Sequence, residues 1–71
     1  MSEIVALFGD YAGAIWHLLQ DNGPLSEQEL LTRTQLTQPQ LYAAIGWLAR
    51  EDKIEGIMKS IDEGKILFWL K

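Results

Sequence analysis

The stretch from residue 26 to residue 53 most constrains the fold, because it carries two helix starts of one chemical type. Ser26 is followed three residues later by Glu29. Thr37 has Gln40 at the same spacing. In each pair the hydroxyl can accept a hydrogen bond from a free backbone N–H, while the Glu or Gln side chain reaches back to the first residue. The pattern therefore predicts two helices, one beginning at each pair.

The two predicted helices lie close together in the sequence. Pro39 suits the first turn of the second helix, where the N–H that proline lacks is not needed. Only Thr34, Gln35 and Leu36 remain for the connection, so the segment is predicted to be a helix-turn-helix, whose second helix would read the bases if the chain binds DNA. Apolar residues at helical spacing are expected to face inward: Leu30, Leu31, Leu41, Ala44, Ile45 and Leu48.

Length and composition favour self-association. The 71 residues make one domain, residues 1–71, and a chain of this size buries only about 60 to 65% of its unfolded surface on folding. Cysteine is absent and there is one histidine, so disulfides are excluded and a structural zinc site is not expected. Oligomerisation remains as a source of stability. Since 48% of the residues are hydrophobic, including three Trp, we expect a homodimer that covers some of them.

The charge balance argues against strong binding to nucleic acid. The net charge is −4, and segments 1–25, 26–53 and 54–71 carry −3, −1 and 0. Proteins whose affinity depends on neutralising phosphates are usually basic, although a local basic patch can suffice. The N-terminus does not resemble a secretory signal, and the longest nearly apolar run, residues 41–49, is too short to cross a bilayer. A cytoplasmic protein without membrane contact is expected.

Residues 4–20 are predicted to form the first helix, with two neighbouring apolar stripes at the helical step of 100°. One stripe contains Ile4, Leu7, Tyr11, Ile15 and Leu18. The other contains Val5, Phe8, Ala12, Trp16 and Leu19. One stripe can cover the next two helices, which leaves the other for a partner. As an alternative, Asp10 could cap a shorter helix and leave residues 3–8 extended.

After residue 53 the pattern changes from helical to extended. Segments 54–61 and 66–70 are rich in β-branched and aromatic residues, and residues 62–65 supply a turn, so a C-terminal β-hairpin is predicted. Leu25 could add one residue pair of a short strand. Side chains alternate along a strand, so Leu67 and Trp69 share one face of the last strand, and its other face is also apolar. One face of the hairpin is therefore left without a core to cover it.

At residue level the chain resembles the small stand-alone bacterial and archaeal winged helix-turn-helix proteins of uncharacterised function. The segments that carry the resemblance are AGAIWHLL at 12–19, NGPLSEQEL at 22–30 and LYAAIGWLAREDKIE at 41–55. The resemblance implies an α+β winged helix-turn-helix fold of three helices and a C-terminal hairpin wing, a homodimer, and a grouping with transcriptional regulators. Related proteins place a glycine between the third helix and the wing, where this chain has Asp52 and Lys53.

The exposed face of the third helix and the wing provide few groups that suit DNA. Major-groove readers use Arg, Lys, Asn or Gln against base edges and phosphates. The candidates for weak contact with double-stranded DNA are Gln38, Gln40, Tyr42, Arg50, Lys59 and Lys65. The glutamines could equally serve only to start the helix, and the two hairpin lysines could serve only solubility.

Trp47 suits a protein contact, because a large ring beside the small residues Ala43 and Gly46 offers an exposed apolar platform. Packing of Trp47 against the domain's own first helix or hairpin is an equal alternative. The candidates for an interface with a second copy or a protein partner are Val5, Phe8, Ala12, Trp16, Leu19, Trp47, Leu67 and Trp69.

No pattern in the sequence points to catalysis. His17 lies on the polar side of the first helix without a second ligand or nucleophile partner, and there is no glycine-rich phosphate loop. No catalytic, cofactor-binding or metal-binding residue is predicted, and no small-molecule substrate is evident. Two functions remain: a homodimeric DNA-binding regulator, and a protein interaction module of the same fold with little or no DNA binding.

Overall fold

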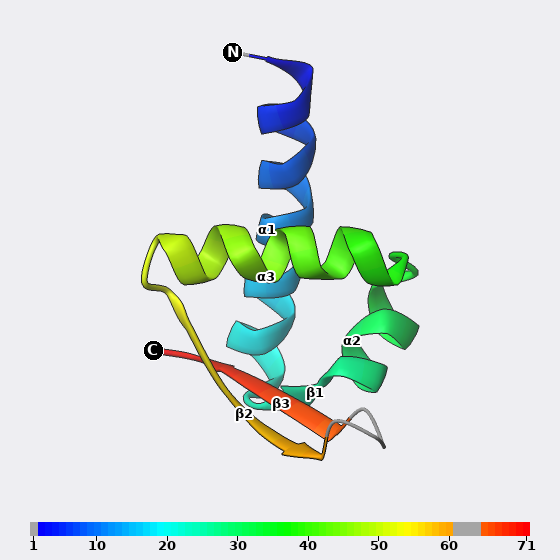
Figure 1. Cartoon of the computed structure of the whole chain (residues 1–71), viewed down its shortest axis with the longest axis vertical. Coiled ribbons are helices and arrows are strands. Elements are labelled where there is room, and N and C mark those ends of the chain that lie inside the picture. The colour runs from blue at the N-terminus through cyan, green and yellow to red at the C-terminus, as the bar shows by residue number, and fades with distance from the viewer. Residues whose placement is uncertain (1, 61–64) are drawn as a thin grey trace.

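The computed structural model describes residues 2–60 and 65–71 of the chain. Three helices are followed by a hairpin in the order α1 (Glu3–Asn22), β1 (Leu25–Ser26), α2 (Glu27–Thr34), α3 (Gln38–Arg50), β2 (Ile54–Ser60) and β3 (Lys65–Leu70). Figure 1 shows α3 crossing the middle of α1, with α2 and the hairpin gathered near the C-terminal end of α1. This arrangement confirms the predicted α+β winged helix-turn-helix fold.

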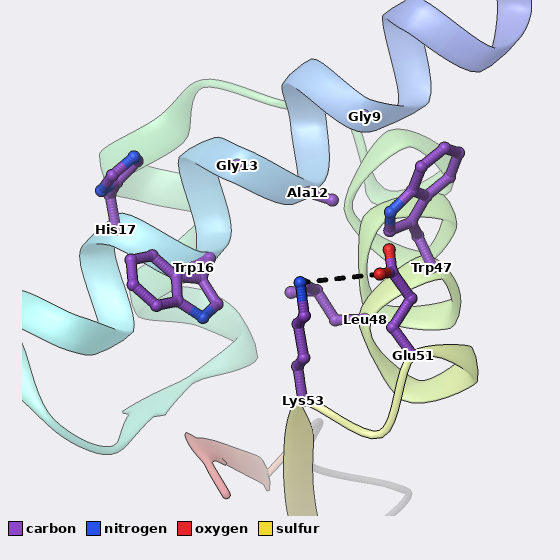
Figure 2. Close-up of a pocket in the computed structure, with 9 residues that line it drawn as sticks. All are labelled: Gly9, Ala12, Gly13, Trp16, His17, Trp47, Leu48, Glu51 and Lys53. Atoms are coloured by element: carbon purple, nitrogen blue, oxygen red, sulfur yellow. Dashed lines mark ion pairs between the residues drawn. The ribbon is translucent and has the colours of Figure 1, made fainter.

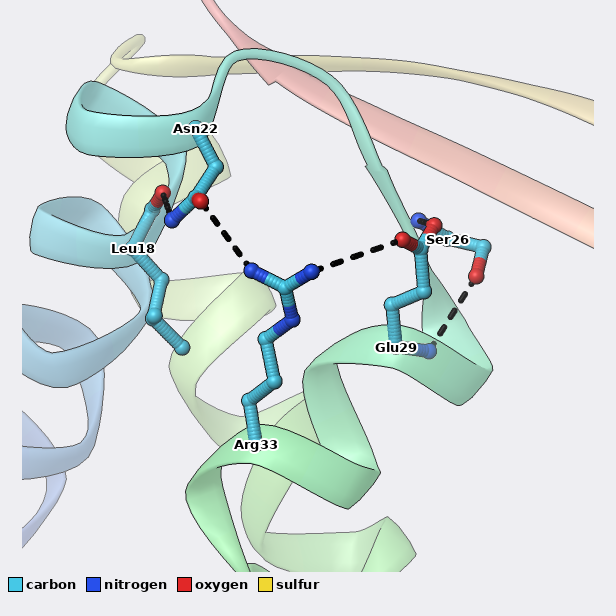
Figure 3. A network of polar contacts seen from close by, with 5 residues as sticks. All are labelled: Leu18, Asn22, Ser26, Glu29 and Arg33. Carbon is cyan, nitrogen blue, oxygen red and sulfur yellow. Dashed lines mark hydrogen bonds and ion pairs between the residues drawn. The ribbon is translucent and has the colours of Figure 1, made fainter.

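Both predicted capping pairs form. The backbone N–H of Glu29 donates to Ser26 Oγ at 3.1 Å, and the N–H of Ser26 donates to Glu29 Oε1 at 3.0 Å (Figure 3). Thr37 and Gln40 make the same two bonds at the start of α3. The N–H and hydroxyl of Ser26 hold the pKa of the Glu29 carboxyl below its ordinary value, because both favour the ionised form.

A second set of polar contacts ties α2 to the end of α1. The Arg33 guanidinium donates to Asn22 Oδ1 at 3.0 Å and lies 3.9 Å from Glu29 Oε2 (Figure 3). Asn22 in turn donates through Nδ2 to the carbonyl of Leu18 at 2.8 Å. The arginine therefore bridges the last turn of α1 and the first turn of α2.

Two connections use residues in the left-handed backbone region. Gln35 ends α2 with φ 63°, and Asp52 joins α3 to β2 with φ 61°. Asp adopts this conformation more readily than most residues, because its short side chain can bond locally. Asp52 also forms an ion pair with Lys71, in which Asp52 Oδ1 and Lys71 Nζ are 2.5 Å apart. The turn between α3 and β2 therefore forms without a glycine.

α1 is continuous from Glu3, with the Ser2 hydroxyl accepting the N–H of Val5 at 3.2 Å, so the alternative start at Asp10 is wrong. The expectation that one apolar stripe is covered and the other left over is also wrong. The buried residues of α1, Ala12, Ile15 and Leu19, come from both stripes. Burial instead changes along the length of α1: its middle and C-terminal parts are covered by α3, α2 and the sheet, and its N-terminal turns are not (Figure 1).

The sheet is antiparallel with strand order β1-β3-β2. The predicted short strand forms, with Leu25 opposite Phe68. A Cβ at Gly56 would lie 3.0 Å from both the Leu67 carbonyl and the Phe68 ring. Glycine at this position therefore lets Phe68 turn into the core. Of the predicted turn at residues 62–65, residues 62–64 lie outside the described residues, and Lys65 is the first residue of β3 and not part of a turn.

The core lies where α1, α3 and the inner face of the sheet meet. Ile15, Leu30 and Leu41 are fully buried, and the other buried apolar residues are Ala12, Leu19, Leu25, Ala44, Leu48, Ile54 and Phe68. The predicted inward residues Leu31 and Ile45 are half-buried against this core. Among the described residues, no helix combines the length and apolar character needed to cross a membrane.

Candidate functional site

A buried carboxylate, that of Glu27, is hydrogen-bonded to two residues near the start of α3. Glu27, the first residue of α2, is only 8% exposed. Its Oε2 accepts the hydroxyl of Tyr42 and, at 3.5 Å, the amide Nε2 of Gln38. Burial raises the pKa of Tyr42 to about 12, and the hydrogen bond and charge of Glu27 add to that effect. Two of the predicted DNA contacts are thus engaged by a negatively charged group.

Gln40 is engaged at both ends of its amide. Its oxygen accepts the backbone N–H of Thr37 at 2.9 Å, and its Nε2 donates to the hydroxyl of Tyr11 at 3.0 Å. The second bond links α3 to α1. The structure therefore gives Gln40 a capping and bridging role, as the simpler interpretation of the sequence suggested.

The rest of the outward face of α3 is small and nearly uncharged. Pro39, Gly46, Ala49 and Arg50 are exposed, and Arg50 is the one cation of this helix. The side chains of Lys59 and Lys65 lie outside the described part of the chain. The exposed DNA candidates of this helix are Gln38, whose amide also donates to Glu27, and Arg50, at the two ends of α3.

An apolar groove lies beside this face, between the C-terminal half of α3 and the hairpin. We call it the α3–hairpin groove; its volume is about 310 Å³. Its lining is Ile45, Ala49, Ile54, Glu55, Gly56, Ile57, Met58, Ile66 and Phe68. Ala49, Ile57 and Met58 are exposed, and Glu55 is the one charged residue of the lining. Sequence reasoning did not single out Met58. The available signal was the alternation of side chains along the strand, which assigns Met58 to one face of the hairpin.

Trp47 packs against the domain's own first helix, one of the two outcomes the sequence left open. A Cβ at Gly9 would lie 3.8 Å from its ring. Trp47 is still half-exposed, because it forms one wall of a second groove, the α1–α3 groove, with Trp16 on the other side (Figure 2). The rings of His17 and Trp16 are in T-shaped contact, with centroids 5.3 Å apart and planes at 85°.

The α1–α3 groove has a volume of about 360 Å³ and a floor of small residues. Gly9, Ala12 and Gly13 line the groove along α1 (Figure 2). The ion pair formed by Lys53 Nζ and Glu51 Oε2, 3.5 Å apart, stands between the two indoles. Sequence reasoning missed this groove. The four-residue spacing of the two glycines was its only local signal.

The predicted interface residues divide into exposed, half-buried and buried groups. Val5 is 40% exposed; Phe8, Trp16, Trp47, Leu67 and Trp69 are half-buried; Ala12 and Leu19 belong to the core. The largest exposed apolar side chains of α1 include Ile4 and Leu7, at 59% and 43%, which the sequence assigned to the covered stripe. We call Ile4, Val5, Leu7 and Phe8 the α1 patch. It lies at the end of α1 that projects beyond the other elements (Figure 1).

Comparison with known proteins identifies the family. The model of the winged helix-turn-helix domain family DUF2582 matches residues 1–68. The chain belongs to this family. A similar solved structure is the solution NMR structure of a protein from Bacteroides thetaiotaomicron, with 32% sequence identity and a TM-score of 0.76, over 92% of this chain and 76% of that chain. No curated protein matches the chain. Membership of DUF2582 supports the fold and is compatible with DNA binding.

Proposed function

We propose that this DUF2582 chain is a non-enzymatic winged helix-turn-helix module that acts as a homodimer and recognises a protein partner through α3 and the hairpin. One observation carries the proposal. The surface that would face DNA in a winged helix presents the apolar α3–hairpin groove and has the Glu27 carboxylate at its start. DNA recognition requires cations there, and Arg50 is the one that α3 supplies.

The α3–hairpin groove suits an apolar segment of a protein. Met58 is 56% exposed and Ile57 49%, and exposed Ala49 leaves room beside α3. The cores of protein interfaces are built from buried apolar side chains, and the charged groups are kept at the rim. Glu55 is placed as a rim group of this kind.

A photoreactive residue at Ala49 tests the protein partner in cells. The expected result is a cross-link to a protein, with no equivalent cross-link from the same residue at Gln20, which is exposed on α1. A cross-link to DNA, or equal cross-linking from both positions, would contradict the proposal.

Homodimer formation is proposed through the α1 patch. Ile4, Val5 and Leu7 expose large apolar side chains next to one another, and a twofold axis would bring the same patch of a second copy against them. Sedimentation at micromolar concentration should give a dimer for the parent and a monomer for Leu7→Glu. Gln20→Glu, on the solvated side of the same helix, should remain dimeric.

A homodimeric DNA-binding regulator is the second candidate, favoured by exposed Arg50 at the end of α3 and exposed Gln38 at its start. An amide-shift titration with mixed-sequence duplex at low and moderate salt separates the two candidates. Shifts along α3 and the hairpin that fade with salt, and that Arg50→Ala weakens, would support the regulator. Absence of shifts at low salt would support the protein interaction module.

A further inference from the structure

The α1–α3 groove is large enough to hold a small molecule. Its volume of about 360 Å³ lies at the lower end of the roughly 300 to 1,000 Å³ found for ligand pockets. Trp16 and Trp47 form two opposite walls, and the Lys53 and Glu51 side chains reach in between them (Figure 2). Aromatic walls of this kind favour a flat apolar group, which can stack on one ring or meet the edge of the other.

The floor of the groove is kept free of side chains. Gly13 lies inside a helix, where glycine is less favourable than alanine. A Cβ at Gly13 would meet nothing within 4 Å, so packing within the domain does not require glycine there. The missing side chain instead leaves the α1 side of the groove uncovered at this position.

The groove also presents one group of each charge. The Glu51 carboxylate and the Lys53 ammonium are 3.5 Å apart, and their side chains are 44% and 54% exposed. An ion pair this exposed contributes little to stability, so a ligand can separate it at small cost. A ligand that carries an ammonium and a carboxylate on one carbon atom could pair with both groups at once.

We propose that the α1–α3 groove binds a free aromatic amino acid as a zwitterion. The aromatic side chain lies between Trp16 and Trp47 above Gly13, the ammonium pairs with Glu51, and the carboxylate pairs with Lys53. This proposal does not depend on which macromolecule the module recognises, because none of these groups belongs to the α3–hairpin groove or the α1 patch.

The chain offers an internal control for the test. Each of its three tryptophans gives one indole N–H signal in a ¹H–¹⁵N spectrum, and Trp69, on the hairpin, does not line the groove. Titration of the ¹⁵N-labelled full chain with L-phenylalanine should shift the signals of Trp16 and Trp47 in a saturable way and leave Trp69 in place. Phenethylamine, which lacks the carboxylate, and N-acetyl-L-phenylalanine, which lacks the ammonium, should each bind at least about fivefold more weakly.

Matched substitutions locate the site. Gly13→Met fills the floor and should weaken L-phenylalanine binding at least tenfold. Gly46→Met is the control, because Gly46 is a helical glycine with open space around it that lies outside the groove. Glu51→Gln should weaken binding about fivefold and remove the preference for phenylalanine over its N-acetyl derivative.

Three results would overturn the proposal. The first is no saturable shift of the Trp16 and Trp47 signals up to millimolar L-phenylalanine. The second is equal movement of the Trp69 signal, which would mean nonspecific contact with exposed rings. The third is equal binding of phenethylamine and phenylalanine, which would mean that the groove selects a cation alone.

Discussion

Replacing Glu27 by Gln tests the role of the buried carboxylate at the start of α3. The substitution keeps the size of the side chain and an acceptor oxygen, but removes the charge. A hydrogen bond to a charged group contributes about 1.5 to 3 kcal/mol, against about 1 kcal/mol for a neutral one, so the bond from Tyr42 should lose about 1 kcal/mol. Loss of a negative charge in the first turn of α2 adds about 0.5 kcal/mol.

The expected total is about 1.5 kcal/mol, a large fraction of the roughly 4 to 10 kcal/mol that holds a domain of this size. Urea unfolding followed by tryptophan fluorescence and circular dichroism measures it. Glu55→Gln is the control, because Glu55 is an exposed carboxylate, and it should stay within about 0.5 kcal/mol of the parent.

A double-mutant cycle with Tyr42→Phe isolates the bond itself. The coupling energy between Glu27 and Tyr42 should be about 1 kcal/mol, because the charged acceptor and its donor lie in contact. Neutralising Glu27 should also raise any affinity for DNA measured at low salt, since the start of α3 loses a negative charge. A stability change below about 0.5 kcal/mol together with a coupling energy near zero would refute the assigned role of Glu27.

Further predictions concern stability and its pH dependence. Leu30→Ala should reduce the free energy of unfolding by about 3 kcal/mol in urea titrations, because it leaves a cavity at a fully buried position. Gly46→Ala should raise the melting temperature by several degrees. Alanine is about 0.5 to 1 kcal/mol more favourable than glycine inside a helix, and the new methyl group at this exposed position meets open space. The pKa of Glu29 is lowered in the folded state, so its carboxylate stabilises the fold above the unfolded-state pKa, and this stabilisation is lost as the pH falls. When the free energy of unfolding is measured at decreasing pH, Glu29→Gln should therefore lose less stability than the parent. The pKa of Tyr42, raised to about 12, means that stability falls as the pH rises from about 10 to about 12, and alkaline titrations of Tyr42→Phe should lack this fall.

Features that depend on neighbouring residues were predictable from the sequence. The capping pairs at Ser26 and Thr37 are local chemistry, so three-residue spacing was enough to place the starts of α2 and α3. The hairpin followed in the same way, from two segments rich in β-branched and aromatic residues on either side of turn residues. The strand pair at Leu25 was predictable because few residues separate the end of α1 from the start of α2.

Features that depend on where elements cross were not predictable. Periodicity showed that α1 has too many apolar residues for one face, but the position of α3 along α1 decides which of them are covered. Ile4 was therefore assigned to the covered stripe and is exposed, whereas Ala12 was left for a partner and is buried. The contact of Glu27 with Tyr42 joins residues 15 positions apart, and no local pattern marks it.

The overhang of α1 connects the composition of the chain to the proposed dimer. A helix of 20 residues spans about 30 Å, whereas the two shorter dimensions of the molecule are 23 and 20 Å. The first turns of α1 therefore project beyond the elements that could cover them, and Ile4 and Leu7 remain exposed. Isolated helical turns are marginal in water, so these turns gain most from a surface that packs against their apolar side. A second copy supplies such a surface by symmetry, because its own overhang carries the same side chains, and this is why the α1 patch is the place where we expect the dimer to form.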